Sequence, residues 1–374
     1  MSRQICIILV LSLLSTMSMN AQSFPWQRPL NIAWSNDGKT FNTPIIYQDS
    51  AGVPSVIRIN GDTLLCAFQW FRAPLNSITW DKVAVKFSYN HGVNWSEPTP
   101  IQIAGLPTGF QRPFDPTLVK LPNDSIRIYF SSSAGTPNIG LDSTVNTYSA
   151  ISHDGINYIF ESNPRVDEIS NRVIDPAVIQ FKQNYHFIAP IGSPQQGAYH
   201  YVSPDGINFT KVSDISSDPS HNWTGNFTHI DTNEIRFYGS SNQYIWYNSS
   251  FNGGVWNGYN NTNILGGGDP SVLKISDSMY MMIYVGPQYP TGLFSYNQNY
   301  KTTLYPNPAE HILYINTHPN MIGSNYAIYS IDGRFIHKGI LSNSIETIHT
   351  FNIPNGNYIF MSQNSVQHFT INKK

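Results

Sequence analysis

One stretch of the sequence decides the expected fold: Phe114-Asp-Pro-Thr-Leu-Val-Lys-Leu-Pro-Asn-Asp-Ser-Ile-Arg-Ile-Tyr-Phe-Ser131. Pro116 fixes φ and has no N–H donor, so it suits the beginning of a strand rather than its centre. Apolar residues follow as far as Leu121, and a Pro-Asn-Asp turn comes next. Ile126, Ile128 and Phe130 then alternate with other residues, as a returning strand does. The stretch therefore predicts a β-hairpin.

The same hairpin recurs along the chain. Other copies open at Pro54, Pro176 and Pro270, and a degenerate fifth copy runs over residues 225–238. Each of the first four hairpins in chain order is followed by a Ser-x-Asp/Asn turn with a nearby Gly, at residues 88–95, 152–158, 203–209 and 250–256. Asp or Asn beside Gly is typical of tight turns. Four-stranded units at roughly 50-residue spacing indicate a β-propeller, here with five blades over residues 22–300.

The two ends of this region bear on the blade count. The turn at residues 35–41 has no hairpin before it, and residues 292–296 form an expected strand without a turn motif. Pairing the chain ends would remove exposed sheet edges. We therefore expect the N-terminal segment to supply the missing outer strand of blade five. A six-bladed propeller with an incomplete blade is the alternative.

The N-terminus and the composition limit the protein's location and partners. Arg3, the apolar run at residues 5–14 and small residues up to Ala21 predict a secretory signal peptide, residues 1–21. Its removal leaves Cys66, in a predicted strand, as a buried thiol. A formal net charge of -2 with 12% charged residues gives no electrostatic reason to expect nucleic acid as a partner. No zinc-type spacing, phosphate-binding loop or Ser-His-Asp signature is present, so we predict no metal or cofactor, and we expect a monomer.

The candidate catalytic residues are the aspartates that open three of the hairpins: Asp115, Asp175 and Asp269. Successive strands of a blade are antiparallel, so the innermost strands all begin at one face and the Ser-x-Asp/Asn turns lie at the other. The three carboxylates should therefore converge around the axis, whereas the turn residues are structural. Carboxylates that share one depression raise the pKa of at least one of them, as glycoside hydrolysis requires. The alternative is that each Asp caps its own turn.

Loops at the same face supply candidate substrate-binding residues. Aromatic faces stack on sugar rings, and guanidinium groups bind hydroxyls or carboxylates. Packing is the alternative role for each of these side chains. The candidates are Trp70, Arg72, Arg112, Arg172, Tyr199, His200, Trp223 and Asn226.

The C-terminal residues, 303–374, have other sequence motifs than the repeated hairpins before them. Tyr-Pro-Asn-Pro-Ala at 305–309, Asp-Gly-Arg at 332–334 and Asn-Gly-Asn-Tyr-Ile at 355–359 occur among alternating apolar residues, which predicts a small antiparallel β-sandwich. In this order the motifs resemble the C-terminal sorting domain of the type IX secretion system of Bacteroidota. The resemblance implies recognition by the secretion machinery and export across the outer membrane, with the product released or attached to the surface.

Over residues 30–298 the predicted propeller resembles two glycosidase groups. The Asp-Pro openings are similar to those of arabinanases, xylosidases and fructosidases, and the Ser-x-Asp/Asn turns resemble the Asp boxes of sialidases. The chain departs from the first group at Val53 and Asn226, where acidic residues would stand, and from sialidases at Gly52 in place of Arg. The resemblance implies a secreted or surface glycoside hydrolase. A non-catalytic lectin or adhesin and a protein-binding propeller are the alternatives, and the sugar, the linkage and the role of each Asp stay open.

Overall fold

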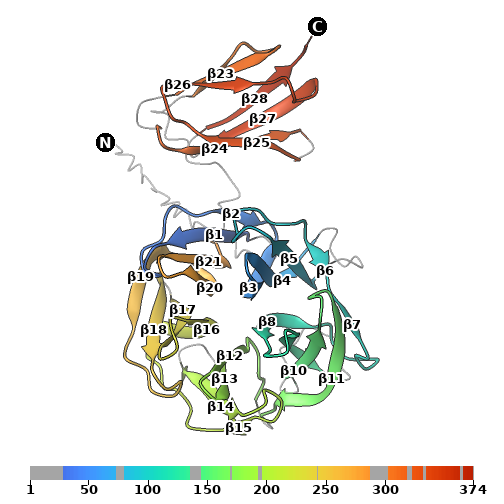
Figure 1. The fold of residues 1–374 in the computed structure, drawn as a ribbon, viewed down its shortest axis with the longest axis vertical. Helices are drawn as coiled ribbons and strands as arrows, with labels where there is room; N and C mark the ends of the chain where they lie inside the picture. Colours follow the sequence, from blue (N-terminus) through green and yellow to red (C-terminus); the bar gives the residue numbers. More distant parts are fainter. Residues whose placement is uncertain are drawn as a thin grey trace, which may run out of the picture. The chain divides into compact units, whose positions relative to one another are not determined.

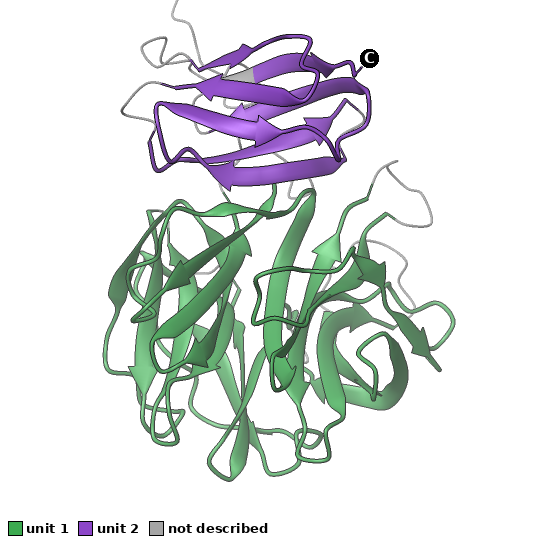
Figure 2. Cartoon of the chain, turned by 45° about the horizontal axis from the view of Figure 1, so that its top comes forward, with its two compact units in different colours: residues 1–289 green, residues 290–374 purple. Residues whose placement is uncertain are grey.

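The chain divides into two compact units, residues 1–289 and residues 290–374 (Figure 2). The computed structural model describes residues 28–72, 80–134, 145–168, 171–192, 196–241, 243–286, 302–317, 322–331, 334–362 and 365–373. The predicted signal peptide and the expected strand at 292–296 lie outside these ranges. All named elements of the described residues are β-strands. None of the described segments is a helix long and apolar enough to cross a membrane.

Five sheets make up the described part of unit 1 and lie around a common centre (Figure 1). They are numbered here from one to five by their innermost strands, in chain order. The strands of each sheet are given from the inside outward. Sheet one contains β3 (Ala51–Asn60), β4 (Thr63–Trp70), β5 (Lys82–Ser88) and β6 (Thr99–Pro100). Sheet two contains β8 (Phe114–Lys120), β9 (Ile126–Ser133), β10 (Val145–Ser152), β11 (Asn157–Val166) and β7 (Gln102–Ala104). Sheet three contains β12 (Ala177–Phe181), β13 (Asn184–Pro190), β14 (Ala198–Ser203) and β15 (Thr210–Lys211). Sheet four contains β16 (His221–His229), β17 (Ile235–Ser241), β18 (Tyr244–Ser250) and β19 (Asn260–Leu265). Sheet five contains β20 (Gly268–Ser276), β21 (Met279–Val285), β1 (Leu30–Ser35) and β2 (Ile45–Gln48).

The innermost strands contact one another in the order β3, β8, β12, β16 and β20, and β20 contacts β3. Sheet five joins the two ends of the unit, because β1 pairs antiparallel with β21, with Leu30 opposite Val285. The N-terminal segment thus contributes two strands, β1 and β2, and not the single outer strand expected from the sequence. β1 lies beside β21 as the third strand of sheet five. Its residues are almost all buried, as suits a strand with sheets on both sides.

A bulge interrupts the pairing near the start of four innermost strands. The register shifts between Gly52 and Ser55, between Phe114 and Thr117, between Asn222 and Gly225, and between Gly268 and Ser271. At the residue before Pro, φ is positive in four places: Val53, Asp115, Asp175 and Asp269, with values of 44–51°. Non-glycine residues rarely adopt this conformation, and bulges re-aim side chains. The backbone therefore directs these four side chains away from a regular strand position.

The Ser-x-Asp/Asn turns close on their own side chains. In sheet two, Ser152 Oγ donates to Asp154 Oδ1 at 2.9 Å and accepts from Gly155 N at 2.9 Å. Asp154 Oδ1 accepts from the backbone N–H groups of Ile156 and Asn157 at 2.8 and 2.7 Å. The turns at Ser35, Ser88, Ser203 and Ser250 contain the same bonds between serine Oγ and glycine N. These turn residues therefore have structural roles.

Each turn glycine lies against the second strand of the preceding sheet. A Cβ on any of these glycines would come within 3.0 Å of a side-chain atom of that strand. The turns therefore pack adjacent sheets together all the way around the ring. The pairs are Gly92 with Met281, Gly155 with Leu65, Gly206 with Tyr129, Gly253 with His186, and Gly38 with Tyr238.

The contact between sheets three and four differs from the others because it contains histidines. His186 stacks on His200 with 5.5 Å between ring centroids, and His186 Nδ1 lies 3.2 Å from His200 Nε2. Both rings are buried. Burial, and then the charge of His186, lowers the pKa of His200 to about 4, and burial lowers the pKa of His186. Since the unfolded chain binds protons that the folded chain excludes, this pair favours folding above pH 6.5 and loses that contribution as the pH falls towards 4.

We expect His200→Phe, which keeps an aromatic ring beside His186, to gain stability relative to the parent protein on acidification. The difference in unfolding free energy should shift by about 2 kcal/mol in favour of the variant between pH 7 and pH 5, at 1.36 kcal/mol per pKa unit. Urea unfolding of both proteins at the two pH values measures the shift. A difference that stays constant with pH would contradict this account of the histidine pair.

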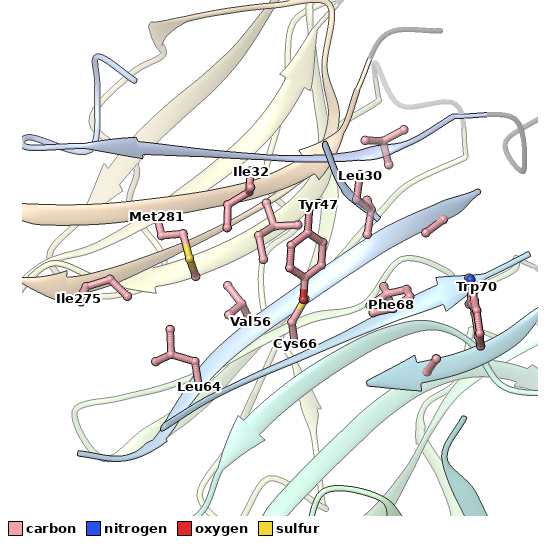
Figure 3. Close-up of a cluster of buried hydrophobic side chains, with 14 residues drawn as sticks. Leu30, Ile32, Tyr47, Val56, Leu64, Cys66, Phe68, Trp70, Ile275 and Met281 are labelled. Carbon is pink, nitrogen blue, oxygen red and sulfur yellow. The ribbon is translucent and has the colours of Figure 1, made fainter. Parts of the chain in front are cut away.

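The cores of unit 1 lie between sheets. Figure 3 shows the cluster between sheets five and one, in which Ile32 and Met281 of sheet five pack beside Val56 and Phe68 of sheet one. Cys66 is fully buried in this cluster, as predicted, and burial raises the pKa of its thiol to about 12. The thiol is therefore unreactive and serves packing.

The described residues of unit 2 form two antiparallel sheets that share one hydrophobic core. Leu313 and Ile348 of the first sheet and Ile328, Phe360 and Phe369 of the second belong to this core. The alternation of apolar and polar residues thus buries one face of each sheet. The first sheet contains β22 (Thr303–Tyr305), β23 (Ile312–Asn316) and β26 (Ile345–His349); the second contains β25 (Phe335–Ile340), β24 (Asn325–Ser330), β27 (Gly356–Ser362) and β28 (Ser365–Ile371).

Candidate functional site

A small pocket lies where the innermost strands begin. Its volume is about 10 Å³, which is room for about one water molecule. Residues of all five sheets form its wall, so it lies on the axis of the ring. The lining residues are Val53, Pro54, Pro116, Thr117, Asp175, Pro176, Gly225, Asn226 and Asp269.

The structure brings the three candidate aspartates together: Asp175 and Asp269 line this pocket, and Asp115 contacts Asp175. The carboxyl groups of Asp115 and Asp175 hydrogen-bond to each other, and the charge of Asp269 acts on both. Asp115 Oδ2 also accepts from Ser131 Oγ at 3.0 Å and from the backbone N–H of Asp175 at 3.3 Å. That N–H belongs to the neighbouring sheet. Asp115 therefore bonds across the ring instead of capping its own turn.

Burial raises the pKa of all three carboxyls, and repulsion between aspartates adds to it for Asp115 and Asp175. Burial raises the pKa of Asp115 to about 6 and that of Asp269 to about 6. The pKa of Asp175 rises well above its usual range through burial and then the charges of Asp115 and Asp269. The hydrogen-bonded pair of Asp115 and Asp175 therefore favours one shared proton over two negative charges.

Cationic and hydroxyl groups offset part of this repulsion. Arg172, a predicted binding residue, lowers the pKa of Asp175 by its charge. Arg28 and the hydroxyl of Thr224 act on Asp269 in the same direction. These contacts keep ionised carboxylates accessible at the site, so that acid and base forms coexist near neutral pH.

Two further predicted residues are held in polar networks. Asn226 lines the pocket, and its Nδ2 donates to Ser55 Oγ at 3.2 Å. Arg112 forms an ion pair with the buried Asp81, which also accepts a hydrogen bond from Gln69. Arg112 thereby links sheets one and two and is held in place by a carboxylate of the protein.

The predicted aromatic residues are packed into the cores and are not brought to the pocket. Trp223 is 1% exposed, lies 5.0 Å from Phe237 between ring centroids, and donates from Nε1 to Tyr259 Oη at 3.1 Å. Tyr199 and His200 are each 4% exposed. A sugar-stacking role for these three rings is therefore replaced by a packing role, because strands between two sheets bury side chains on both faces.

Trp70 and Arg72 form a separate pair at the end of β4. Trp70 is 8% exposed, and the guanidinium of Arg72 lies 5.2 Å from the centroid of its ring. The cation thus covers an aromatic face that was predicted to hold a sugar. Arg72 itself is exposed.

Sequence reasoning missed Arg28, Ser131 and Thr224 as groups that act on the aspartates. Ser131 lies near the end of a second strand, and Arg28 precedes β1, the third strand of its sheet. Ends of second strands and starts of third strands lie at the same face as starts of first strands. That topological rule would have found both residues once β1 was placed beside β21.

Comparisons with known proteins give one family and several structures. No curated protein sequence matches the chain. In structure the chain is similar to a Hadza microbial sialidase at 12% identity and a TM-score of 0.48, over 71% of this chain and 61% of that one. It is similar to a Bombyx mori GH32 β-fructofuranosidase at 11% identity and a TM-score of 0.48, over 94% of this chain and 90% of that one. An exo-β-1,3-galactanase from Phanerochaete chrysosporium is 12% identical, with a TM-score of 0.46 over 87% of this chain and 91% of that one.

The family match concerns the C-terminal unit. It spans residues 303–374, and its description is a secretion system C-terminal sorting domain. The matched range coincides with the motifs from which the sorting domain was predicted. Residues 303–374 are therefore a secretion system C-terminal sorting domain.

Proposed function

We propose that unit 1 is a five-bladed β-propeller that hydrolyses a glycosidic bond at the mouth of its central pocket. The observation that carries the proposal is the meeting of Asp115, Asp175 and Asp269, from three different sheets, with raised pKa values beside one axial pocket. Glycoside hydrolysis needs a carboxylic acid and a carboxylate that flank the scissile bond. A buried acid cluster supplies both protonation states near neutral pH.

The geometry suggests a catalytic role for each of the three aspartates. Asp115 and Asp175 are in hydrogen-bond contact, so a glycosidic bond cannot lie between them. This pair acts as one unit, in which Asp175 holds the proton and Asp115 accepts its hydrogen bond. The pair donates the proton to the leaving oxygen. Asp269, on the other side, is the base or nucleophile that the reaction requires.

The size of the pocket indicates where a sugar would lie. A volume of about 10 Å³ holds one water molecule and not a sugar ring. The ring would therefore rest on the mouth, over the apolar side chain of Val53 and the amide of Asn226, with Arg172 nearby for its hydroxyls.

The test is turnover by the full mature chain on a panel of arabinosides, xylosides, fructosides, galactosides and sialosides. We expect Asp175→Asn and Asp269→Asn each to lower kcat/KM by about 10²–10⁴-fold, the usual contribution of general acid–base catalysis. Asp205→Asn is the matched control and should keep full activity, because Asn90 and Asn252 hold the same turn position elsewhere. If the protein hydrolyses none of these glycosides, the hydrolase proposal is wrong.

The proposed roles of Asp175 and Asp269 also predict how kcat/KM depends on pH in this assay. Asp269 must be ionised, so kcat/KM should rise as the pH passes about 6, the raised pKa of this group. It should fall again at the higher pH where Asp175 loses its proton. A profile without a rise near pH 6 would exclude Asp269 as the base.

A binding protein on the same scaffold is the second candidate. Val53 lines the pocket at the place of a carboxylate in three of the other four repeats, which leaves the acid cluster incomplete on the side of sheet one. Such a protein would bind a glycan without turnover, and its binding would survive Asp175→Asn. A glycan array probed with the parent protein and the variant separates the two candidates.

The sorting domain supports secretion or surface attachment, and the predicted signal peptide at residues 1–21 would supply the first export step. The carbohydrate is proposed as the ligand of a monomer, and the secretion machinery as the protein partner. We expect a chain ending at residue 302 to accumulate in the periplasm, while the full chain reaches the medium or cell surface. Immunoblots of cell fractions measure this, and equal export of both chains would contradict it.

A further inference from the structure

A second hollow lies at the outer edge of the ring, between sheets two and three. Its volume is about 460 Å³, and residues 160–165 of β11 line it together with Ile207 and Asn208 from the turn of sheet three. None of these residues lines the central pocket. The volume falls in the range of about 300–1,000 Å³ that is typical of small-molecule sites.

An excursion of β11 builds the hollow. Thr147 pairs with Val166 and Ser149 pairs with Glu161, so residues 162–165 protrude opposite a single residue of β10. Arg165 holds the excursion, because its Nη2 donates to the carbonyl oxygens of Ser162 and Asn163. Asn163 has a φ of 70°, a conformation that Asn tolerates better than most residues. The exposed side chains of the excursion are thus fixed by a buried guanidinium.

The base of the hollow contains a polar group that is not satisfied. Arg165 is 6% exposed, and its Nε is buried without a hydrogen-bond partner in the described part of the chain. An unpaired N–H of a buried guanidinium is costly, and native structures contain few of them. Because this atom has almost no accessible surface, an oxygen of a ligand would satisfy it only after a local shift of residues 162–165.

The charges around the hollow nearly cancel. Glu161 accepts from Arg127 Nε at 2.8 Å, from Arg127 Nη2 at 2.9 Å and from Ser149 Oγ at 2.7 Å, so its charge is compensated within the protein. Arg165 feels the charges of Glu161 and Asp205 in one direction and that of Arg127 in the other. Such a balanced site has no strong preference for an anion or a cation.

The groups at the rim suit a polyhydroxylated ligand. Asn163 is exposed, and Asn208 donates from Nδ2 to Asp205 at 2.8 Å, which leaves its amide oxygen for a hydroxyl donor. The side chains of Phe160 and Pro164 add apolar surface for the C–H face of a sugar ring. We propose that this hollow is a second glycan-binding site, selective for a neutral oligosaccharide, that holds a polymer away from the reacting bond. The proposal rests on the proposed function only for the choice of a glycan as the polymer.

The test uses the full chain with Asp175→Asn, so that no probe is hydrolysed. Binding is measured by calorimetric titration. The neutral probes are cellotriose, xylotriose, mannotriose and β-1,3-galactotriose, and the anionic probe is trigalacturonic acid. The variant Asn163→Gly with Asn208→Thr removes both amides. Gly suits the positive φ, and Thr40 holds the position of Asn208 in the turn of sheet five. The control is Asn157→Thr, the same change in the turn of sheet two.

We expect at least one neutral trisaccharide to bind, and its Kd to rise at least tenfold in the double variant and to stay unchanged in the control. With Asp175 restored, turnover of a small chromogenic glycoside should be the same in all three proteins. Equal binding in variant and control, no binding of any neutral probe, or tighter binding of the anionic probe would each overturn the second site. Loss of binding in the double variant of a chain that hydrolyses no glycoside would support the second site while refuting the hydrolase.

Discussion

Replacing Asp175 with Asn is expected to stabilise the protein at pH 8, although it removes a proposed catalytic group. Raising a folded pKa from 3.8 to about 6, as for Asp115 and Asp269, destabilises the fold by about 3 kcal/mol above pH 6, at 1.36 kcal/mol per unit. The pKa of Asp175 is also raised, well above its usual range. Since the Asn amide can still donate to Asp115 and tolerates the positive φ, we expect Asp175→Asn to be more stable than the parent protein at pH 8.

The sign of the effect should depend on pH. A carboxyl whose pKa is higher in the folded chain is protonated in both the folded and the unfolded chain below pH 4, so it does not change the free energy of unfolding there. As the pH rises above 4, it lowers the free energy of unfolding progressively. The advantage of Asp175→Asn should therefore vanish at pH 4. Urea unfolding at pH 4, 6 and 8 measures it.

Asp205→Asn is the matched control for this measurement. Asp205 Oδ1 accepts from the backbone of Ile207 and Asn208, and these bonds hold the pKa of Asp205 below its usual range. The lowered pKa means that the charged form of Asp205 stabilises the fold, so Asp205→Asn should lower the unfolding free energy at pH 8, opposite in sign to Asp175→Asn. A loss of stability in Asp175→Asn at pH 8 would mean that Asp175 serves as a structural hydrogen-bond acceptor, and the acid-cluster account would fail.

The second large effect is expected at Gly225, beside the central pocket. Its φ is 149°, and a Cβ there would lie 2.0 Å from the carbonyl oxygen of Tyr238 and 3.1 Å from Pro270 Cδ. Backbone cannot yield as a flexible side chain does, so β16 would have to separate from its neighbours. We expect Gly225→Ala to lower the unfolding free energy by at least about 3 kcal/mol. Denaturant unfolding measures the loss.

Gly258 provides the comparison, because its φ is 111° but a Cβ would meet nothing within 4 Å. Gly258→Ala carries the cost of an unfavourable φ alone, about 1 kcal/mol. The excess loss in Gly225→Ala therefore measures the steric contact. Equal losses in the two variants would show that β16 adapts, and that the close approach of sheets four and five is not required for the pocket.

Repeated local chemistry explains why so much of the ring could be predicted. Pro116 and its equivalents mark the starts of inner strands, and the Ser-x-Asp/Asn turns satisfy their own hydrogen bonds within a few residues. Such signals act through neighbours in the chain, so the sequence displays them directly. The sorting domain was found in the same way, from motifs that occur in a fixed order.

The prediction of the site was less complete, because burial depends on partners far away in the sequence. Trp223 resembles a sugar platform in the sequence, yet sheet four encloses it with Phe237, Trp246 and Tyr259. Arg112 resembles a substrate ligand, yet Asp81 pairs with it. An aromatic or cationic residue in a loop carries no local mark that distinguishes these outcomes.

The sequence by itself determined five recurring hairpins, their turns and a C-terminal sorting domain, because prolines, glycines and short polar side chains act on the adjacent backbone. Only the tertiary structure decided that β1 lies beside β21, that Asp115 bonds to Asp175, and that β11 opens a second hollow. These features join residues from about 40 to about 255 positions apart. Their geometry follows from how whole sheets pack, and strand periodicity does not encode that packing.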